Sequence, residues 1–204
     1  MEIRKELQDF LNDNNILELI EDQAWAELFS EAEINIPYDI SALHKILVKS
    51  GLAFTYSILQ SLDRIPAGFF EDFGSLTSIT IPNNVTSIGS DAFRWCTSLT
   101  SITIPDSVTS IGMYAFQYCS KLTDIVLPNN ITDISQCMFF ECSSLTSITI
   151  PDSVTNIEFG AFIRCSSLTS ITIPDSVTSI PQRAFEGCSS LTSVTLSNNI
   201  TKID

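Results

Sequence analysis

The chain has 204 residues, of which 44% are hydrophobic and 17% charged, a composition that excludes a disordered tail and leaves room for one large domain or two small ones. Its formal net charge of −14 argues against binding to nucleic acid or to an anionic membrane, since both are bound through clustered Lys and Arg. The first residues, MEIRKELQDF, lack the apolar core of a secretory signal, and no apolar run is long enough to span a membrane, so we expect a cytoplasmic protein.

Residues 1–64 show the apolar spacing of helices. Ile3, Leu7 and Phe10 recur at helical intervals, and similar stretches follow further along the segment. We therefore predict an N-terminal helical domain over residues 1–64 that caps the first repeat, since the end of a solenoid exposes apolar core. This segment holds 12 of the 24 acidic residues and 5 of the 10 basic ones, which is consistent either with a solvated surface or with a docking surface for a basic partner.

From Ile65 onward the chain repeats a unit of 23 residues. Cys165–Ile180 reads CSSLTSITIPDSVTSI, and similar segments begin at Phe73, Cys96, Cys119, Cys142 and Cys188. One isoleucine per unit keeps the period without any insertion, at Ile65, Ile88, Ile111, Ile134, Ile157, Ile180 and Ile203. A fixed internal period of this length predicts a solenoid of stacked coils.

Within one unit the pattern predicts three elements. Alternating apolar residues in 75–82 predict a short strand, followed by a turn at Pro82. A second extended stretch is predicted over 85–88. In 89–96, the spacing of Ala92, Phe93 and Cys96 predicts a single helical turn that closes the coil.

The pattern C-x-x-L-x-x-I-x-I-P-x-x-V-x-x-I-x-x-x-A-F resembles the BspA-like leucine-rich repeats, the 23-residue bacterial type, over residues 65–204. The resemblance implies a right-handed solenoid of six repeats with a parallel β-sheet. With the helical cap, the expected fold class is α+β. The family implies adhesion and protein binding rather than catalysis. Many relatives are exported, and the missing signal is a departure from them. Residues 1–64 lie outside the resemblance.

The cysteines share one register and do not form a recognisable site. Stacking of Cys96, Cys119, Cys142, Cys165 and Cys188 predicts buried structural thiols, because parallel neighbouring side chains do not meet disulfide geometry and no metal-binding spacing occurs. Cys137 is out of register, either as an exposed free thiol or as a filler at a variable position. With one histidine, His44, and no phosphate-binding motif, we predict no enzymatic activity, no metal and no cofactor.

Variation is concentrated in the segment that precedes each repeat cysteine. The outward strand positions are nearly all Ser and Thr, whereas this segment carries large aromatics and arginines, the composition of protein-binding hot spots. We predict partner-binding residues at Arg94, Trp95, Tyr114, Gln117, Tyr118, Phe140, Glu141, Phe159, Arg164 and Arg183. The alternative is that these aromatics only shield the closing turn of the coil.

Three functional hypotheses follow. The first is a protein-interaction module that binds an intracellular, possibly basic, protein and makes no direct contact with nucleic acid or membrane. The second, motivated by the net charge, is a small acidic inhibitor of the phage anti-defence or toxin-immunity type that occludes a basic nucleic-acid-binding enzyme. The third is a bacterial surface adhesin whose signal peptide was removed. Because the last repeat ends in NNITKID with no capping helix, end-on homodimerisation is a further hypothesis.

Overall fold

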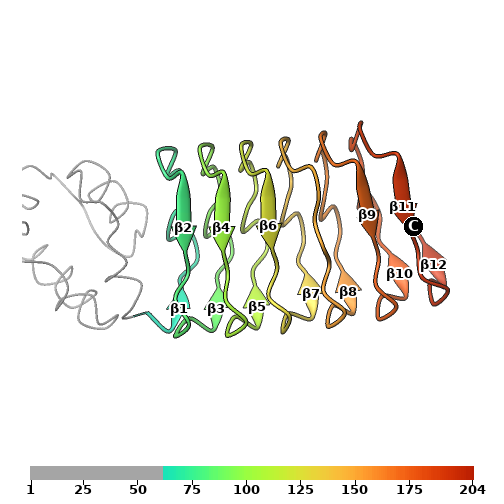
Figure 1. The fold of residues 1–204 in the computed structure, drawn as a ribbon, viewed down its shortest axis with the longest axis horizontal. Helices are drawn as coiled ribbons and strands as arrows, with labels where there is room; N and C mark the ends of the chain where they lie inside the picture. Colours follow the sequence, from blue (N-terminus) through green and yellow to red (C-terminus); the bar gives the residue numbers. More distant parts are fainter. Residues whose placement is uncertain (1–61) are drawn as a thin grey trace, which may run out of the picture.

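The computed structural model describes residues 62–204, which wind into a stack of coils with the strands side by side along its length (Figure 1). These residues contain strands and turns and no helix. The predicted solenoid of 23-residue repeats is confirmed. The predicted helical domain of residues 1–64 lies, apart from its last three residues, outside the described part of the chain.

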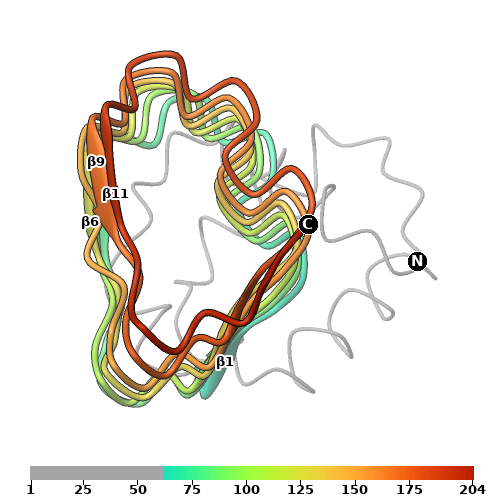
Figure 2. The ribbon, with the colours of Figure 1, turned by 90° about the vertical axis from the view of Figure 1, so that its right-hand side faces the viewer.

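Each coil carries two short strand positions on different sides of the stack. Viewed end on, strands β6, β9 and β11 lie on one side and β1 lies on another (Figure 2). The strands of the first position are β2 (Ser78–Thr80), β4 (Ser101–Thr103), β6 (Asp124–Val126), β9 (Ser170–Thr172) and β11 (Ser193–Thr195). Those of the second are β1 (Arg64–Ile65), β3 (Ser87–Ile88), β5 (Ser110–Ile111), β7 (Asp133–Ile134), β8 (Asn156–Ile157), β10 (Ser179–Ile180) and β12 (Lys202–Ile203).

All pairings are parallel and join residues that are 23 apart in the sequence. Ile79 pairs with Ile102, for example, and Ile65 pairs with Ile88. The first-position strands form the groups β2-β4-β6 and β9-β11, and the fourth coil joins β6 through a single bridge between Val126 and Thr149. Because the repeat contains no insertion, the pairing places every residue beside its equivalent in the next coil.

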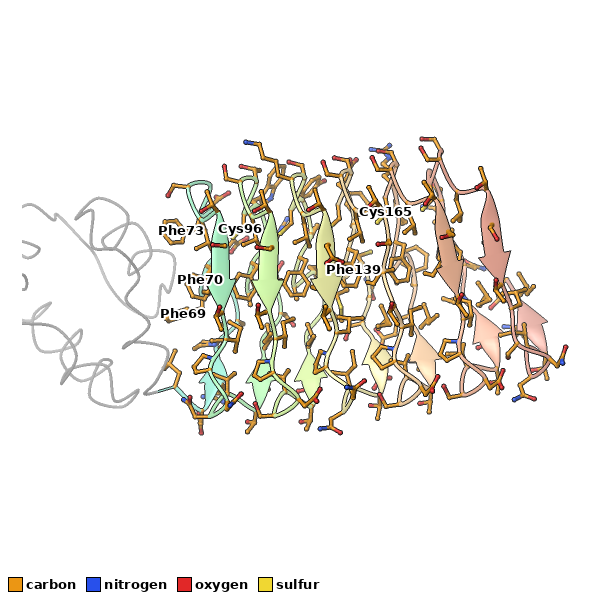
Figure 3. All side chains as sticks on the ribbon, in the orientation of Figure 1. Phe69, Phe70, Phe73, Cys96, Phe139 and Cys165 are labelled. Atoms are coloured by element: carbon orange, nitrogen blue, oxygen red, sulfur yellow. The ribbon has the colours of Figure 1, made fainter. Side chains whose placement is uncertain are left out.

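The core consists of columns of identical or similar apolar side chains, the clearest of which is a column of phenylalanines. Its rings are stacked with centroids 4.8–5.6 Å apart and planes within 11° of parallel. Phe70 and Phe139 are labelled in Figure 3. The column comprises Phe70, Phe93, Phe116, Phe139, Phe162 and Phe185. One coil alone leaves its ring exposed on both faces, so burial of this apolar area requires neighbouring coils.

The predicted helical turn in 89–96 is wrong. The segment is a series of tight turns, in which Arg94 N–H donates to the Asp91 carbonyl (3.0 Å) and Cys96 N–H to the Phe93 carbonyl (3.1 Å). Alternate N–H groups leave the coil altogether: those of Asp91, Phe93 and Trp95 donate to carbonyls of the next coil at 2.8–2.9 Å. An α-helix directs its N–H groups along its own axis, so it does not form where these groups must bond sideways to a neighbour.

Candidate binding strip

The turn segments place two residues per coil in the left-handed backbone region. In the second coil these are Asp91 (φ 57°) and Trp95 (φ 60°). The first left-handed position is occupied through the stack by Gly68, Asp91, Tyr114, Cys137, Gly160 and Arg183, and the second by Asp72, Trp95, Tyr118, Glu141, Arg164 and Gly187. A left-handed conformation costs a non-glycine residue about 1–2 kcal/mol. The bonds to the adjoining coils hold the backbone in place, so large side chains project from these positions in regular columns.

We name the column of the second left-handed position, from Asp72 to Arg164, the turn strip. Two pairs of neighbours in this strip contact each other directly. The Trp95 and Tyr118 rings are stacked with centroids 3.9 Å apart and planes 13° from parallel, and Arg164 Nη1 donates to Glu141 Oε1 at 2.7 Å. This hydrogen bond to the Glu141 carboxylate raises the pKa of the Arg164 guanidinium. Trp95, Tyr118, Glu141 and Arg164 therefore occupy equivalent positions in successive coils, as their 23-residue spacing requires.

The column that lies one residue before the turn strip in each coil includes the predicted contact residues Arg94, Gln117 and Phe140. These side chains are half-buried or buried. Phe140 is half-buried and meets the Tyr118 ring edge-on, with centroids 5.3 Å apart. Arg94 Nη1 pairs with Glu71 (3.4 Å) and Asp91 (3.3 Å), while its Nε is buried without a partner in the described residues. Gln117 is only 9% exposed, so the predicted contact residue Gln117 is not presented to a partner.

The other three predicted residues lie on the same turn segments, and two of them, Phe159 and Arg183, contact each other. The Arg183 guanidinium carbon lies 5.9 Å from the centroid of the Phe159 ring, a cation–π contact on a ring that is 40% exposed. Tyr114 is half-buried, and its hydroxyl accepts a hydrogen bond from Gln136 Nε2 at 2.7 Å. Arg183 also pairs with Glu186 at 3.2 Å.

The aromatic residues of the turn segments differ in whether they shield the coil or remain available to a partner. Tyr118 and Phe140 are partly covered by their neighbours, as shielding requires, yet Trp95 remains 38% exposed. In the second coil the turn strip thus presents a large accessible indole.

One member of the turn strip was not anticipated from the sequence. Asp72 occupies the same position in the first coil as Trp95 in the second, with φ 63° and an exposed side chain. Asp72 directly precedes Phe73, the first residue of the first copy of the repeat. The 23-residue period, counted back from Trp95, places Asp72 in the same column.

The repeat cysteines are free thiols, and the first four are buried as predicted, whereas Cys188 in the last coil is half-buried. Each donates its S–H to the carbonyl of the phenylalanine 26 residues earlier, at 3.0–3.2 Å, in the pairs Cys96–Phe70, Cys119–Phe93, Cys142–Phe116, Cys165–Phe139 and Cys188–Phe162. Burial raises the pKa of the Cys96 thiol to about 12. Burial likewise raises the pKa of the Cys119 and Cys142 thiols. These are the inert thiols of a core.

Cys137 is also a free thiol but belongs to a different column. It occupies the first left-handed position (φ 49°) and is only 6% exposed. The interpretation of Cys137 as an exposed thiol is therefore wrong, and it fills space beside Gly160. Within residues 62–204 no group of three His, Cys, Asp or Glu residues is arranged to hold a metal ion. In the same part of the chain no helix is long and apolar enough to cross a membrane.

Solved structures resemble this solenoid. A leucine-rich cell surface protein from Faecalibacterium prausnitzii is 42% identical with a TM-score of 0.58, over 60% of this chain and 32% of that one. The leucine-rich repeat protein of T. pallidum is 33% identical with a TM-score of 0.65, over 69% and 65%. The pneumococcal vaccine antigen PcpA is 25% identical with a TM-score of 0.56, over 61% and 32%. The chain thus spans about a third of two of these proteins and about two thirds of the other. No curated protein shows significant similarity.

The sequence also matches a family model, described as the BspA-type leucine-rich repeat region in six copies, over residues 6–123 and 109–204. The match begins at residue 6, so the expectation that residues 1–64 lie outside the family resemblance is wrong. The boundary between a helical domain and the solenoid stays a prediction. Together with the 23-residue parallel coils, the match shows that the chain belongs to the BspA-type leucine-rich repeat family.

Proposed function

We propose that the chain is a non-enzymatic binding module of a bacterial cell-surface protein and that it binds a protein partner. The observation that carries the proposal is the 42% identity with a protein described as a leucine-rich cell surface protein. A second relative is described as a vaccine antigen, which is consistent with exposure to a host. The adhesin hypothesis therefore takes precedence over the intracellular module, and the cytoplasmic location stays an untested prediction.

The turn side of the stack is the surface best suited to specific recognition. The outward strand residues repeat as Ser and Thr from coil to coil, as in β4 and β9, and such a uniform surface offers little to distinguish one partner from another. The turn side instead presents an exposed Trp95, the Phe159–Arg183 pair and the Glu141–Arg164 ion pair. Large aromatics and arginines are the residues that most often dominate binding energy at protein interfaces.

Surface location is tested by treating intact cells of the source organism with protease and detecting the chain with an antibody. We expect the chain to be digested while a cytoplasmic marker protein stays intact. Digestion of the chain only after lysis would place it inside the cell and restore the intracellular hypothesis.

The binding surface is tested with two matched double variants of the chain, assayed against a panel of immobilised extracellular proteins. Trp95→Ala/Tyr118→Ala removes the stacked pair of the turn strip, and Ser170→Ala/Thr172→Ala removes two exposed hydroxyls of β9. We expect the first variant to weaken any binding found with the unmodified chain at least about tenfold, since hot-spot truncations typically cost 2 kcal/mol or more. The second should bind normally. The opposite ranking would move the interface to the strand side, and circular dichroism confirms that both variants fold.

A further inference from the structure

The first neighbouring pair in the turn strip differs from the pairs that follow it. Further along, ring meets ring between Trp95 and Tyr118, and carboxylate meets guanidinium between Glu141 and Arg164 at 2.7 Å. At the start of the strip a carboxylate, Asp72, stands next to an indole. The aromatic face carries partial negative charge, so a carboxylate and a ring face do not attract each other. Tyr118 and Glu141 also place a ring next to a carboxylate, but the Glu141 carboxylate is paired with Arg164, whereas no ion pair of Asp72 occurs within the described residues.

The Trp95 ring has one covered face. Tyr118 stacks on it from the third coil, and the coil on the other side supplies the short side chain of Asp72. The backbones of these two coils are joined next to the pair, because Asp72 N–H donates to the Arg94 carbonyl at 2.8 Å. The two residues are therefore separated by one coil spacing, about 4.8 Å between backbones. The 38% exposure of Trp95 agrees with an uncovered area on this side.

Asp72 is a free carboxylate in an acidic setting. Its side chain is exposed, and its carboxylate makes no hydrogen bond or ion pair within the described residues. Arg94, whose backbone carbonyl accepts from the Asp72 N–H, has its guanidinium already shared between Glu71 and Asp91, at 3.4 and 3.3 Å. The whole chain carries a net charge of −14, which attracts a positively charged segment over long distances.

We infer that Asp72 and Trp95 form a clamp for one cationic side chain, the arginine or lysine of a basic segment in a protein partner. The cation pairs with the Asp72 carboxylate and lies against the uncovered indole face, where Trp is the strongest cation–π acceptor among the aromatic residues. This inference rests on the proposed function, because it gives the chemistry of the partner at one end of the turn strip.

A sugar ring is the main competing occupant of an exposed indole. Sugar recognition needs several free hydrogen-bonding groups around the aromatic platform in addition to the ring. Around Trp95, however, the Arg94 guanidinium is engaged with two carboxylates, and Gln117 is buried. One free carboxylate beside a ring matches a cation better than it matches a sugar.

The test measures fluorescence anisotropy of a labelled peptide, (Gly-Ser-Arg)₃, titrated with the 204-residue chain. Its control is the same peptide with citrulline in place of arginine, which keeps the shape and removes the charge. The variants are Asp72→Asn and Trp95→Leu, with Asp152→Asn as the matched control. Asn suits a left-handed backbone, so Asp72→Asn leaves the fold unstrained. Asp152 is an exposed carboxylate on a turn after the first strand position, so its removal changes the net charge equally.

We expect the citrulline peptide to bind about tenfold more weakly than the arginine peptide, and Asp72→Asn and Trp95→Leu each to weaken the arginine peptide by about three- to tenfold. Asp152→Asn should change binding less than twofold. The double variant should lose less than the product of the single losses, because both residues hold the same cation.

Equal losses from Asp72→Asn and Asp152→Asn would show diffuse charge attraction and overturn the clamp. Quenching of indole fluorescence by maltoheptaose in a Trp25→Phe background, with no response to the arginine peptide, would assign the ring to sugar binding and overturn it too. Failure of the clamp is distinct from failure of the proposed function. If Trp95→Ala/Tyr118→Ala still abolishes binding to a panel protein, the turn strip remains an interface whose partner contact is not a cation.

Discussion

At the scale of single residues, the repeat cysteines show how a column of identical side chains is stabilised. A thiol in a dry interior is a weak donor that needs an acceptor, and the fold supplies one in the carbonyl of the phenylalanine 26 residues earlier. The thiols of Cys119 and Cys142 are buried among apolar neighbours, and burial raises their pKa. Ionisation of such a thiol therefore opposes folding.

This gives a prediction on the pH dependence of stability. In the unfolded chain a thiol ionises above pH about 8.5. In the folded chain the raised pKa keeps Cys119 and Cys142 protonated, so the folded state binds more protons and loses stability as the pH rises. Each such thiol lowers the free energy of unfolding by about 1.4 kcal/mol per pH unit above that point.

Urea unfolding between pH 7 and pH 10.5 measures the effect, with Cys142→Ala as the comparison. We expect the unmodified chain to lose stability more steeply above pH 9 than the variant does, since the variant lacks one of the thiols. Parallel pH curves for the two proteins would contradict the assignment of Cys142 as a buried protonated thiol.

At the scale of elements, the turn segment is the part of the coil that sequence periodicity described wrongly. The spacing of Ala92, Phe93 and Cys96 is compatible with a helical turn, but it is equally compatible with tight turns that point the same three residues inward. The choice between them depends on where the N–H groups bond. The neighbouring coil offers carbonyls at 2.8–2.9 Å, and the segment adopts the conformation that uses them.

Glycine at the start of this segment provides a test of how closely the coils approach. A Cβ added at Gly112 would lie 2.4 Å from the Ser90 backbone nitrogen, whereas one added at Gly74 would meet nothing closer than 3.6 Å. We expect Gly112→Ala to lower the free energy of unfolding by about 1–3 kcal/mol, because backbone atoms must shift, and Gly74→Ala to have little effect. Chemical denaturation of both variants checks this. An equal effect would show that the coils relax without cost.

At the scale of the whole molecule, the stack is a linear array in which each coil contacts its neighbours. The parallel pairs all join residues 23 apart, and in the phenylalanine column each ring stacks on the ring of the next coil. The stability of such an array is approximately a sum over coils and the interfaces between them. Its length can therefore change by whole repeats without altering the faces of the coils.

Deletion of residues 143–165 removes one repeat and joins Cys142 to the Ser-Ser-Leu that begins at Ser166. We expect this variant to keep a strand-containing circular dichroism spectrum and a cooperative unfolding transition, with lower stability because one interface is lost. The control deletes residues 143–164, which shifts every later residue by one position and turns the apolar columns outward. If both deletions unfold, coils are not interchangeable units.

Much of this protein is determined by the sequence alone. The uninterrupted 23-residue period places each residue in a column, so stacked coils, parallel pairing, buried thiols and the shared register of Trp95 and Tyr118 follow from counting. A column is buried when equivalent residues of successive coils stack. Such stacking depends on the 23-residue period and not on the backbone conformation within each coil. The helical domain predicted for residues 1–64 remains a prediction.

Only the tertiary structure decided what the columns present to solvent. It buried Gln117 and Cys137, left Asp72 and Trp95 exposed, and replaced a helical turn by two left-handed residues per coil. The physical reason is that exposure on the turn side depends on backbone angles, and these angles are set by hydrogen bonds to the adjoining coils. Such bonds join residues 22 positions apart in the sequence, and a periodic pattern of side chains does not encode them locally.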